Sequence, residues 1–146
     1  MKRIFYALLP IVLLFLSACS EKIETYKYAV IDQNVTISGK KEVQLANRFM
    51  QYWDARSRHD FSSSYTYELP YTQFIKNKNV YISEGKSTYQ NYKVILKNIN
   101  YDEKNNDIVW LQRQYIHDKT ILMLKSKWIY INDTWYHKYT FSVFPE

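Results

Sequence analysis

The stretch WIYINDTWYH, from Trp128 to His137, decides the fold because it predicts a two-stranded hairpin of defined register. Branched and aromatic residues flank Asn132-Asp133, a pair that tolerates the positive backbone angles of a two-residue turn. The predicted cross-strand partners on one face are Tyr130 with Trp135, Trp128 with His137, Ser126 with Tyr139, Leu124 with Phe141 and Leu122 with Val143. The other face pairs Lys127 with Lys138, and two opposed lysines belong in water. The first face is therefore predicted to be the core face.

Further strands extend this sheet toward the N-terminus. A turn at Asp118-Lys119 continues the core face, and the predicted partners are Tyr115 with Leu122, Arg113 with Leu124, Leu111 with Ser126 and Val109 with Trp128. Val94 and Leu96 are expected on the same face. We predict strands over residues 92–101, 107–117, 121–131 and 134–143, because each range is rich in branched and aromatic residues. An earlier stretch, Tyr26 to Ile31, adds an edge strand or lies against the body.

Helices are predicted ahead of the strands. From Lys41 to Arg56 the apolar residues recur three and four apart, which indicates an amphipathic helix: Val43, Ala46, Phe49, Met50 and Trp53. Asp60 is expected to cap a second short helix through Ser64 to Glu68, which Pro70 ends. A third short turn is expected at residues 71–75. The predicted fold is α+β, with a long N-terminal amphipathic helix and one or two short helices packed in the concave face of a curved antiparallel sheet of about four strands.

This order of elements resembles the nuclear transport factor 2-like superfamily, a cystatin-like cone. The resemblance covers about residues 41–144 and rests on the long helix, on Asp60, Phe61 and Tyr65, and on the paired tryptophans Trp128 and Trp135. It implies a strongly curved sheet that wraps around the first helix. Members of the superfamily include isomerases and dehydratases that work inside the cone as well as binding and dimerising modules. The resemblance therefore does not choose a function.

The first 18 residues predict export. A basic tip at Lys2-Arg3 precedes an uncharged apolar run from Ile4 to Leu16, which is too short for a transmembrane helix of about 20 residues. Leu16-Ser17-Ala18-Cys19 resembles the lipobox of bacterial lipoproteins, so Cys19 is expected to carry the lipid, palmitate included. The alternative is an ordinary signal peptide before a buried thiol. By resemblance to the sorting rule of bacterial lipoproteins, in which an aspartate after the cysteine implies retention in the inner membrane, Ser20 favours the outer membrane, facing the periplasm, if the cell has two membranes.

The chain is predicted to comprise a signal peptide at 1–18, a lipidated N-terminus and tether at 19–38, and one domain at 39–146. Cys19 is the only cysteine, so a lipidated chain has no disulfide. The net charge of +6 is scattered in short basic runs, which argues against a nucleic-acid groove. The three histidines do not have metal-ligand spacing, and neither a metal nor a cofactor is expected.

Candidate ligand-binding residues lie on the predicted core face: His137, Arg113, Ser126, Tyr139 and Trp128. Asp54 on the long helix could point toward them. A histidine there is most often a core residue packed on Trp128, with backbone or hydroxyl partners. Arg113 is costly to bury alone, so it meets a carboxylate, reaches the mouth of the cone, binds an anionic ligand or extends to solvent.

No catalytic residue is assigned. The predicted function is a lipid-anchored periplasmic binding or assembly module without catalytic activity, which binds a small ligand in the cone or a protein partner, itself included, on the convex face at Trp110, Ile129 and Tyr136. Two alternatives remain open. One is an isomerase- or hydrolase-type enzyme that uses His137 and Arg113, and the other is a structural envelope lipoprotein with a filled core.

Overall fold

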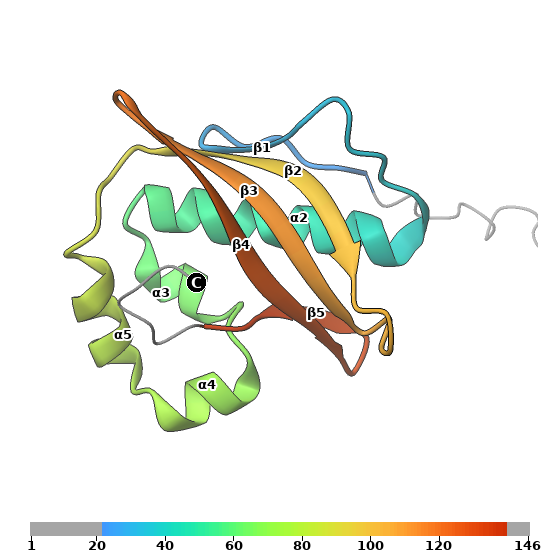
Figure 1. Ribbon diagram of the computed structural model, residues 1–146. Helices are drawn as coiled ribbons and strands as arrows, with labels where there is room; N and C mark the ends of the chain where they lie inside the picture. Colours follow the sequence, from blue (N-terminus) through green and yellow to red (C-terminus); the bar gives the residue numbers. More distant parts are fainter. Residues whose placement is uncertain (1–21, 140–146) are drawn as a thin grey trace, which may run out of the picture.

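The computed structural model describes residues 22–139, which form an α+β fold of four helices and a curled five-stranded sheet (Figure 1). The elements follow in the order β1 (Ala29–Ile31), α2 (Gly39–Ser57), α3 (Phe61–Tyr65), α4 (Pro70–Ile75), α5 (Lys78–Gly85), β2 (Lys93–Tyr101), β3 (Ile108–His117), β4 (Thr120–Ile131) and β5 (Thr134–His137). The predicted signal peptide, Cys19 and the predicted partners Phe141 and Val143 lie outside the described residues. Within residues 22–139, no helix is long and apolar enough to cross a membrane.

The sheet is mixed rather than antiparallel, and it has one strand more than the four predicted. Its order is β1-β2-β3-β4-β5, with β1 parallel to β2 and every other neighbouring pair antiparallel. Of the two alternatives for residues 26–31, the edge strand is the observed one. Helices α2 to α5 form the long crossover that a parallel pair requires.

The predicted register of the long hairpins is confirmed. Trp128 lies opposite His137 and Tyr130 opposite Trp135, across a turn in which Asn132 and Asp133 both have positive φ. Between β3 and β4 the observed partners are those predicted, from Val109 with Trp128 to Tyr115 with Leu122. Because side chains alternate strictly along a strand, a correct register also assigns the faces of the sheet correctly.

The core lies between α2 and one face of the sheet. Leu45 and Phe49 on α2 pack against Val94, Leu111 and Trp128, and all five side chains are fully buried. Leu122 was predicted on this core face, but it is 46% exposed. The free end of the β3–β4 hairpin projects beyond α2, so no helix covers that end (Figure 1).

Strand β5 is shorter than predicted, and the pair of Ser126 with Tyr139 does not form. The strand ends at His137, after which only the Lys138 N–H still bonds to the carbonyl of Lys127. Tyr139 instead turns to α5, where its hydroxyl lies 3.1 Å from a Glu84 carboxylate oxygen and its ring lies 5.5 Å from that of Tyr81. Within the described chain, the first half of β4 is therefore an uncovered sheet edge.

The short helices differ in detail from the prediction. Asp60 caps α3 by accepting the Ser63 N–H at 3.1 Å, but the helix starts at Phe61 and ends at Tyr65. Pro70 begins α4 rather than ending the preceding helix. Proline is favoured at the first helical position, because the N–H of that residue makes no hydrogen bond within the helix. Helix α5 was not predicted, because its apolar residues do not recur with helical periodicity. Two of its residues, Tyr81 and Gly85, are buried.

We expect Gly85→Ala to lower the free energy of unfolding, because an added Cβ would lie 2.6 Å from Cγ of the buried Phe61 ring. Overpacking of this kind costs about 1–3 kcal/mol, more than the roughly 0.5–1 kcal/mol that alanine gains over glycine in a helix. Urea unfolding measures the change, with Ser83→Ala on the exposed side of α5 as the control. A Gly85→Ala protein as stable as the control would contradict this packing.

Candidate functional site

A pocket of about 220 Å³ opens at the uncovered edge of β4, between the second half of α2 and the end of β5. Four of the five predicted ligand-binding residues line it: Arg113, Ser126, His137 and Tyr139. Because the pocket lies at a sheet edge, residues from the outer face reach it as well, namely Trp110, Lys125, Lys127 and Lys138. Tyr52, Trp53 and Arg56 contribute the wall that α2 forms.

The fifth predicted residue, Trp128, is fully buried behind the pocket and does not line it. Its indole N–H donates to the Ser126 hydroxyl at 3.3 Å, and its ring lies 5.4 Å from the His137 ring, edge to face. Trp128 therefore supports two pocket residues and would not itself contact a ligand there.

His137 is held by a buried carboxylate that the sequence analysis missed. Its Nδ1 atom lies 2.9 Å from Oε2 of Glu68, and its ring stacks on that of Tyr52 with centroids 4.3 Å apart. The backbone reinforces the contact, because the His137 N–H donates to the Tyr67 carbonyl and the His137 carbonyl accepts the Leu69 N–H. The expected packing on Trp128 is thus confirmed, whereas the polar partner of the histidine is a carboxylate rather than a backbone or hydroxyl group.

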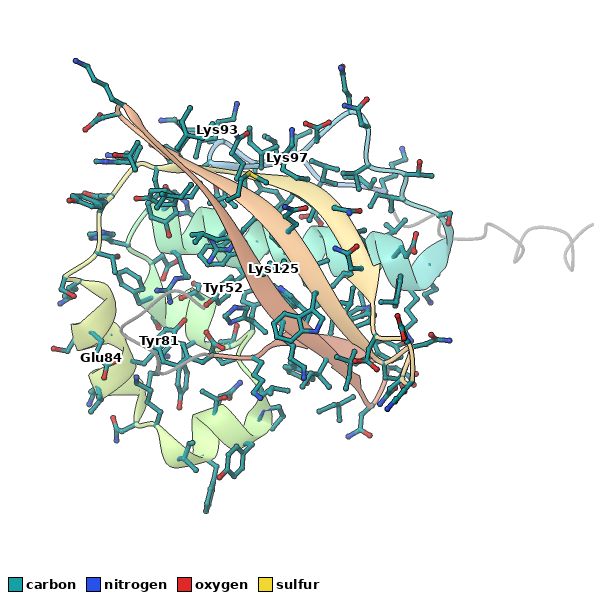
Figure 2. The ribbon with its side chains drawn as sticks, in the orientation of Figure 1. Tyr52, Tyr81, Glu84, Lys93, Lys97 and Lys125 are labelled. Carbon is teal, nitrogen blue, oxygen red and sulfur yellow. The ribbon has the colours of Figure 1, made fainter. Side chains whose placement is uncertain are left out.

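Glu68 is completely buried and collects hydrogen bonds from three elements. Besides the bond to His137, its Oε1 atom accepts the Tyr52 hydroxyl from α2 at 2.8 Å and the Tyr81 hydroxyl from α5 at 2.9 Å. Figure 2 shows both tyrosines on the helical side of β4. Such a set of donors offsets the desolvation of a buried carboxylate, which would otherwise cost several kcal/mol.

Arg113 has no comparable partner. Its guanidinium lies 4.0 Å from the centre of the Trp53 ring, and no carboxylate within residues 22–139 forms an ion pair with it. Its Nε atom is buried without a hydrogen-bond acceptor. Burial lowers the pKa of Arg113 to about 10, so that the side chain is still positively charged at pH 7. Among the alternatives drawn from the sequence, the carboxylate partner is wrong for the described chain.

Arg56 is a second cation of the pocket that sequence reasoning did not single out. One terminal nitrogen donates to the Tyr81 hydroxyl at 2.8 Å, which connects Arg56 to Glu68 through that tyrosine. Its guanidinium lies 5.6 Å from the centre of the Tyr52 ring and 5.3 Å from that of Phe61. Like Arg113, it has a buried Nε atom without an acceptor.

Other polar residues considered from the sequence lie elsewhere. Asp54, which was considered as a residue that could point toward the candidate ligand-binding residues, has other partners. Its carboxylate accepts the Tyr28 N–H at 3.0 Å and binds Arg58 at 2.8 Å, so it tethers the segment before β1 to α2. His59 contacts the carbonyl of Tyr89, and His117 stacks on the Tyr89 ring. No group of three potential metal ligands occurs in the part of the chain that the structure describes.

The predicted partner surface on the outer face of the sheet is partly exposed. Trp110 is 37% exposed, and the Lys127 ammonium lies 5.2 Å from the centre of its ring. Ile129 and Tyr136 are partly buried, and Tyr136 lies beside the Arg48 guanidinium. On the outer face Ile129 is the cross-strand partner of both Ile108 and Tyr136, so a short apolar row lies beside Trp110 and the cations.

We expect Glu68→Ala to destabilise the protein strongly, because Tyr52, Tyr81 and His137 would lose their common acceptor. Removing one member of a buried charged network costs about 3–5 kcal/mol. Guanidinium unfolding would measure the loss, and Glu103→Ala, at an exposed acid in the β2–β3 loop, provides the control. Equal stability of the two variants would mean that the Glu68 hydrogen bonds do not support the fold.

Comparisons of the chain with protein-family models, with curated proteins and with solved structures found no match.

Proposed function

We propose that this protein is a lipid-anchored binding module of the bacterial cell envelope, which takes up a small ligand in the pocket at the edge of β4 and has no catalytic activity. The observation that carries the proposal is the pocket itself, because it brings together four residues chosen from the sequence for ligand binding. A domain whose core serves only as a scaffold has no need of such a pocket. The pocket instead combines aromatic walls with polar groups, as ligand sites commonly do.

The anchor and location belong to the same proposal. The lipobox at residues 16–19 supports acylation of Cys19, and Ser20 supports the outer membrane, facing the periplasm. The curled sheet with α2 along its face agrees with a nuclear transport factor 2-like cone. On the same proposal, the exposed Trp110 with Ile129 and Tyr136 provides a contact surface for a second copy or another envelope protein.

A second candidate function is acid–base catalysis, and one observation favours it. Glu68 binds Nδ1 of His137, which orients the ring and leaves Nε2 as the nitrogen for a proton transfer, with Arg113 in the same pocket. Two hydroxyls of the pocket have other partners, because that of Ser126 accepts the Trp128 indole N–H and that of Tyr139 lies 3.1 Å from a Glu84 carboxylate oxygen. Binding therefore accounts for more of the geometry than catalysis does.

The anchor is tested with Cys19→Ala. In cells fed radioactive palmitate, the unchanged protein is expected to incorporate label and to sediment with the membranes, because two or three acyl chains hold a protein firmly at a bilayer. The variant is expected to lose the label and to leave the membrane fraction. Retention of both properties by Cys19→Ala would exclude lipidation at this residue. Cys19→Ser serves as a second variant with nearly the same side-chain volume.

Ligand binding is tested on the full-length lipidated protein purified from its own envelope. Native mass spectrometry is expected to show a complex heavier than the acylated chain, and denaturation is expected to release one small molecule in a ratio approaching one per chain. If the native protein carries no such molecule and its melting temperature rises with no soluble metabolite tested, the binding proposal is wrong. Chemical turnover of a released molecule by the purified protein would favour the catalytic candidate instead.

A further inference from the structure

The lining of the β4-edge pocket has one sign of charge. Among the described residues, the lining contains five cations, Arg56, Arg113, Lys125, Lys127 and Lys138, and no aspartate or glutamate. A concave site lined by one sign of charge concentrates ligands of the opposite sign, because its low-dielectric walls focus the field. The charge of the lining therefore favours an anion over a neutral or cationic molecule.

The residues that line the pocket also hold buried N–H donors without acceptors. Within residues 22–139, three buried side-chain nitrogen or oxygen atoms have no hydrogen-bond partner, and they are Nε1 of Trp53, Nε of Arg56 and Nε of Arg113. All three are N–H donors, and all three residues line this pocket. Buried donors without acceptors cost about 1–3 kcal/mol each, so the wall behind the pocket holds N–H groups that no acceptor within residues 22–139 satisfies.

Arg113 is the side chain best placed to contact such a group. Stacking on Trp53 covers a face of its guanidinium, while its N–H donors radiate from the edge in a planar fork that matches carboxylate and phosphate oxygens. Two other arginines differ from it, because Arg58 pairs with Asp54 and Arg48 donates to the Trp135 carbonyl. Arg113 has neither kind of partner in the described chain.

Ser126 adds a neutral donor to the same wall. Its oxygen already accepts the Trp128 indole N–H at 3.3 Å, so its own hydrogen is available to another acceptor. At about 220 Å³ the pocket is smaller than the roughly 300–1,000 Å³ typical of sites for drug-sized ligands. A volume of this size favours a compact anion.

We propose that the pocket at the edge of β4 binds a small anion with a carboxylate or phosphate group, and that Arg113 is its principal contact. The inference rests on the proposed binding function and specifies its ligand class. Its energetic logic is that a partly buried cation without an acidic partner within residues 22–139 gains an opposite charge when the anion enters. Removing the charge should then weaken binding without weakening the fold.

The test measures binding to the full-length lipidated protein in detergent by calorimetry and by the shift in melting temperature. Inorganic phosphate and citrate are the anionic probes, which separate phosphate from carboxylate recognition, and glucose is the neutral probe. At least one anion is expected to bind saturably, raise the melting temperature and lose affinity as ionic strength increases, whereas glucose should not bind. Each result is compared for Arg113→Met and for Lys93→Met, an exposed lysine far from the pocket (Figure 2).

Arg113→Met is expected to reduce anion affinity at least tenfold, with a melting temperature of the free protein equal to or above that of the unchanged chain. Lys93→Met should leave affinity unchanged. Equal anion affinity in both variants, or binding of glucose as tight as that of the anions, would overturn the inference. If the envelope-purified protein releases a neutral molecule, the binding function stands and the anion class is wrong. If nothing is released and no probe binds, both proposals fail.

Discussion

The buried Glu68 carboxylate is the interaction on which the arrangement of the helices against the sheet depends. It accepts hydroxyls from Tyr52 on α2 and Tyr81 on α5 and binds His137 at the end of β5. Three elements distant in sequence thus meet at one side chain with no solvent exposure. A buried charge tolerates few alternative positions for its donors, because each lost hydrogen bond leaves an uncompensated polar group. The network therefore fixes geometry as well as contributing stability.

This constraint also explains why there is a pocket. The backbone of His137 forms hydrogen bonds with Tyr67 and Leu69 along the edge of β5 that faces away from β4. Two residues later, Tyr139 contacts Glu84 and Tyr81 on α5. The strand consequently stops pairing before it covers the first half of β4. Within residues 22–139, an edge that a longer β5 would have closed has no partner strand beside Arg113 and Ser126. The same contacts that stabilise the fold thereby create the opening.

The parts of the structure that were predictable are those set by local periodicity. The opposed Lys127 and Lys138 identify the outer face, and Asn132-Asp133 sets the turn, so the register of the hairpin follows from neighbours in sequence. The end of β5 is different, because the alternation continues through Tyr139 while a tertiary contact with α5 ends the pairing. Glu68 was missed for a related reason. It lies 69 residues from His137, and its only local signal is that it is a lone acid between Tyr67 and Leu69-Pro70.

His137 and Arg113, the two basic residues selected from the sequence, line the same pocket but differ in their polar partners. His137 has a carboxylate, a stacked ring and two backbone hydrogen bonds, so its presence is explained by the fold alone. Arg113 has the Trp53 ring and an unsatisfied N–H, and a methionine of similar length would fill that space at lower cost. The contacts of Arg113 within residues 22–139 therefore leave its charge without an acidic partner. Its place among five cations that line one cavity makes ligand recognition the more economical explanation.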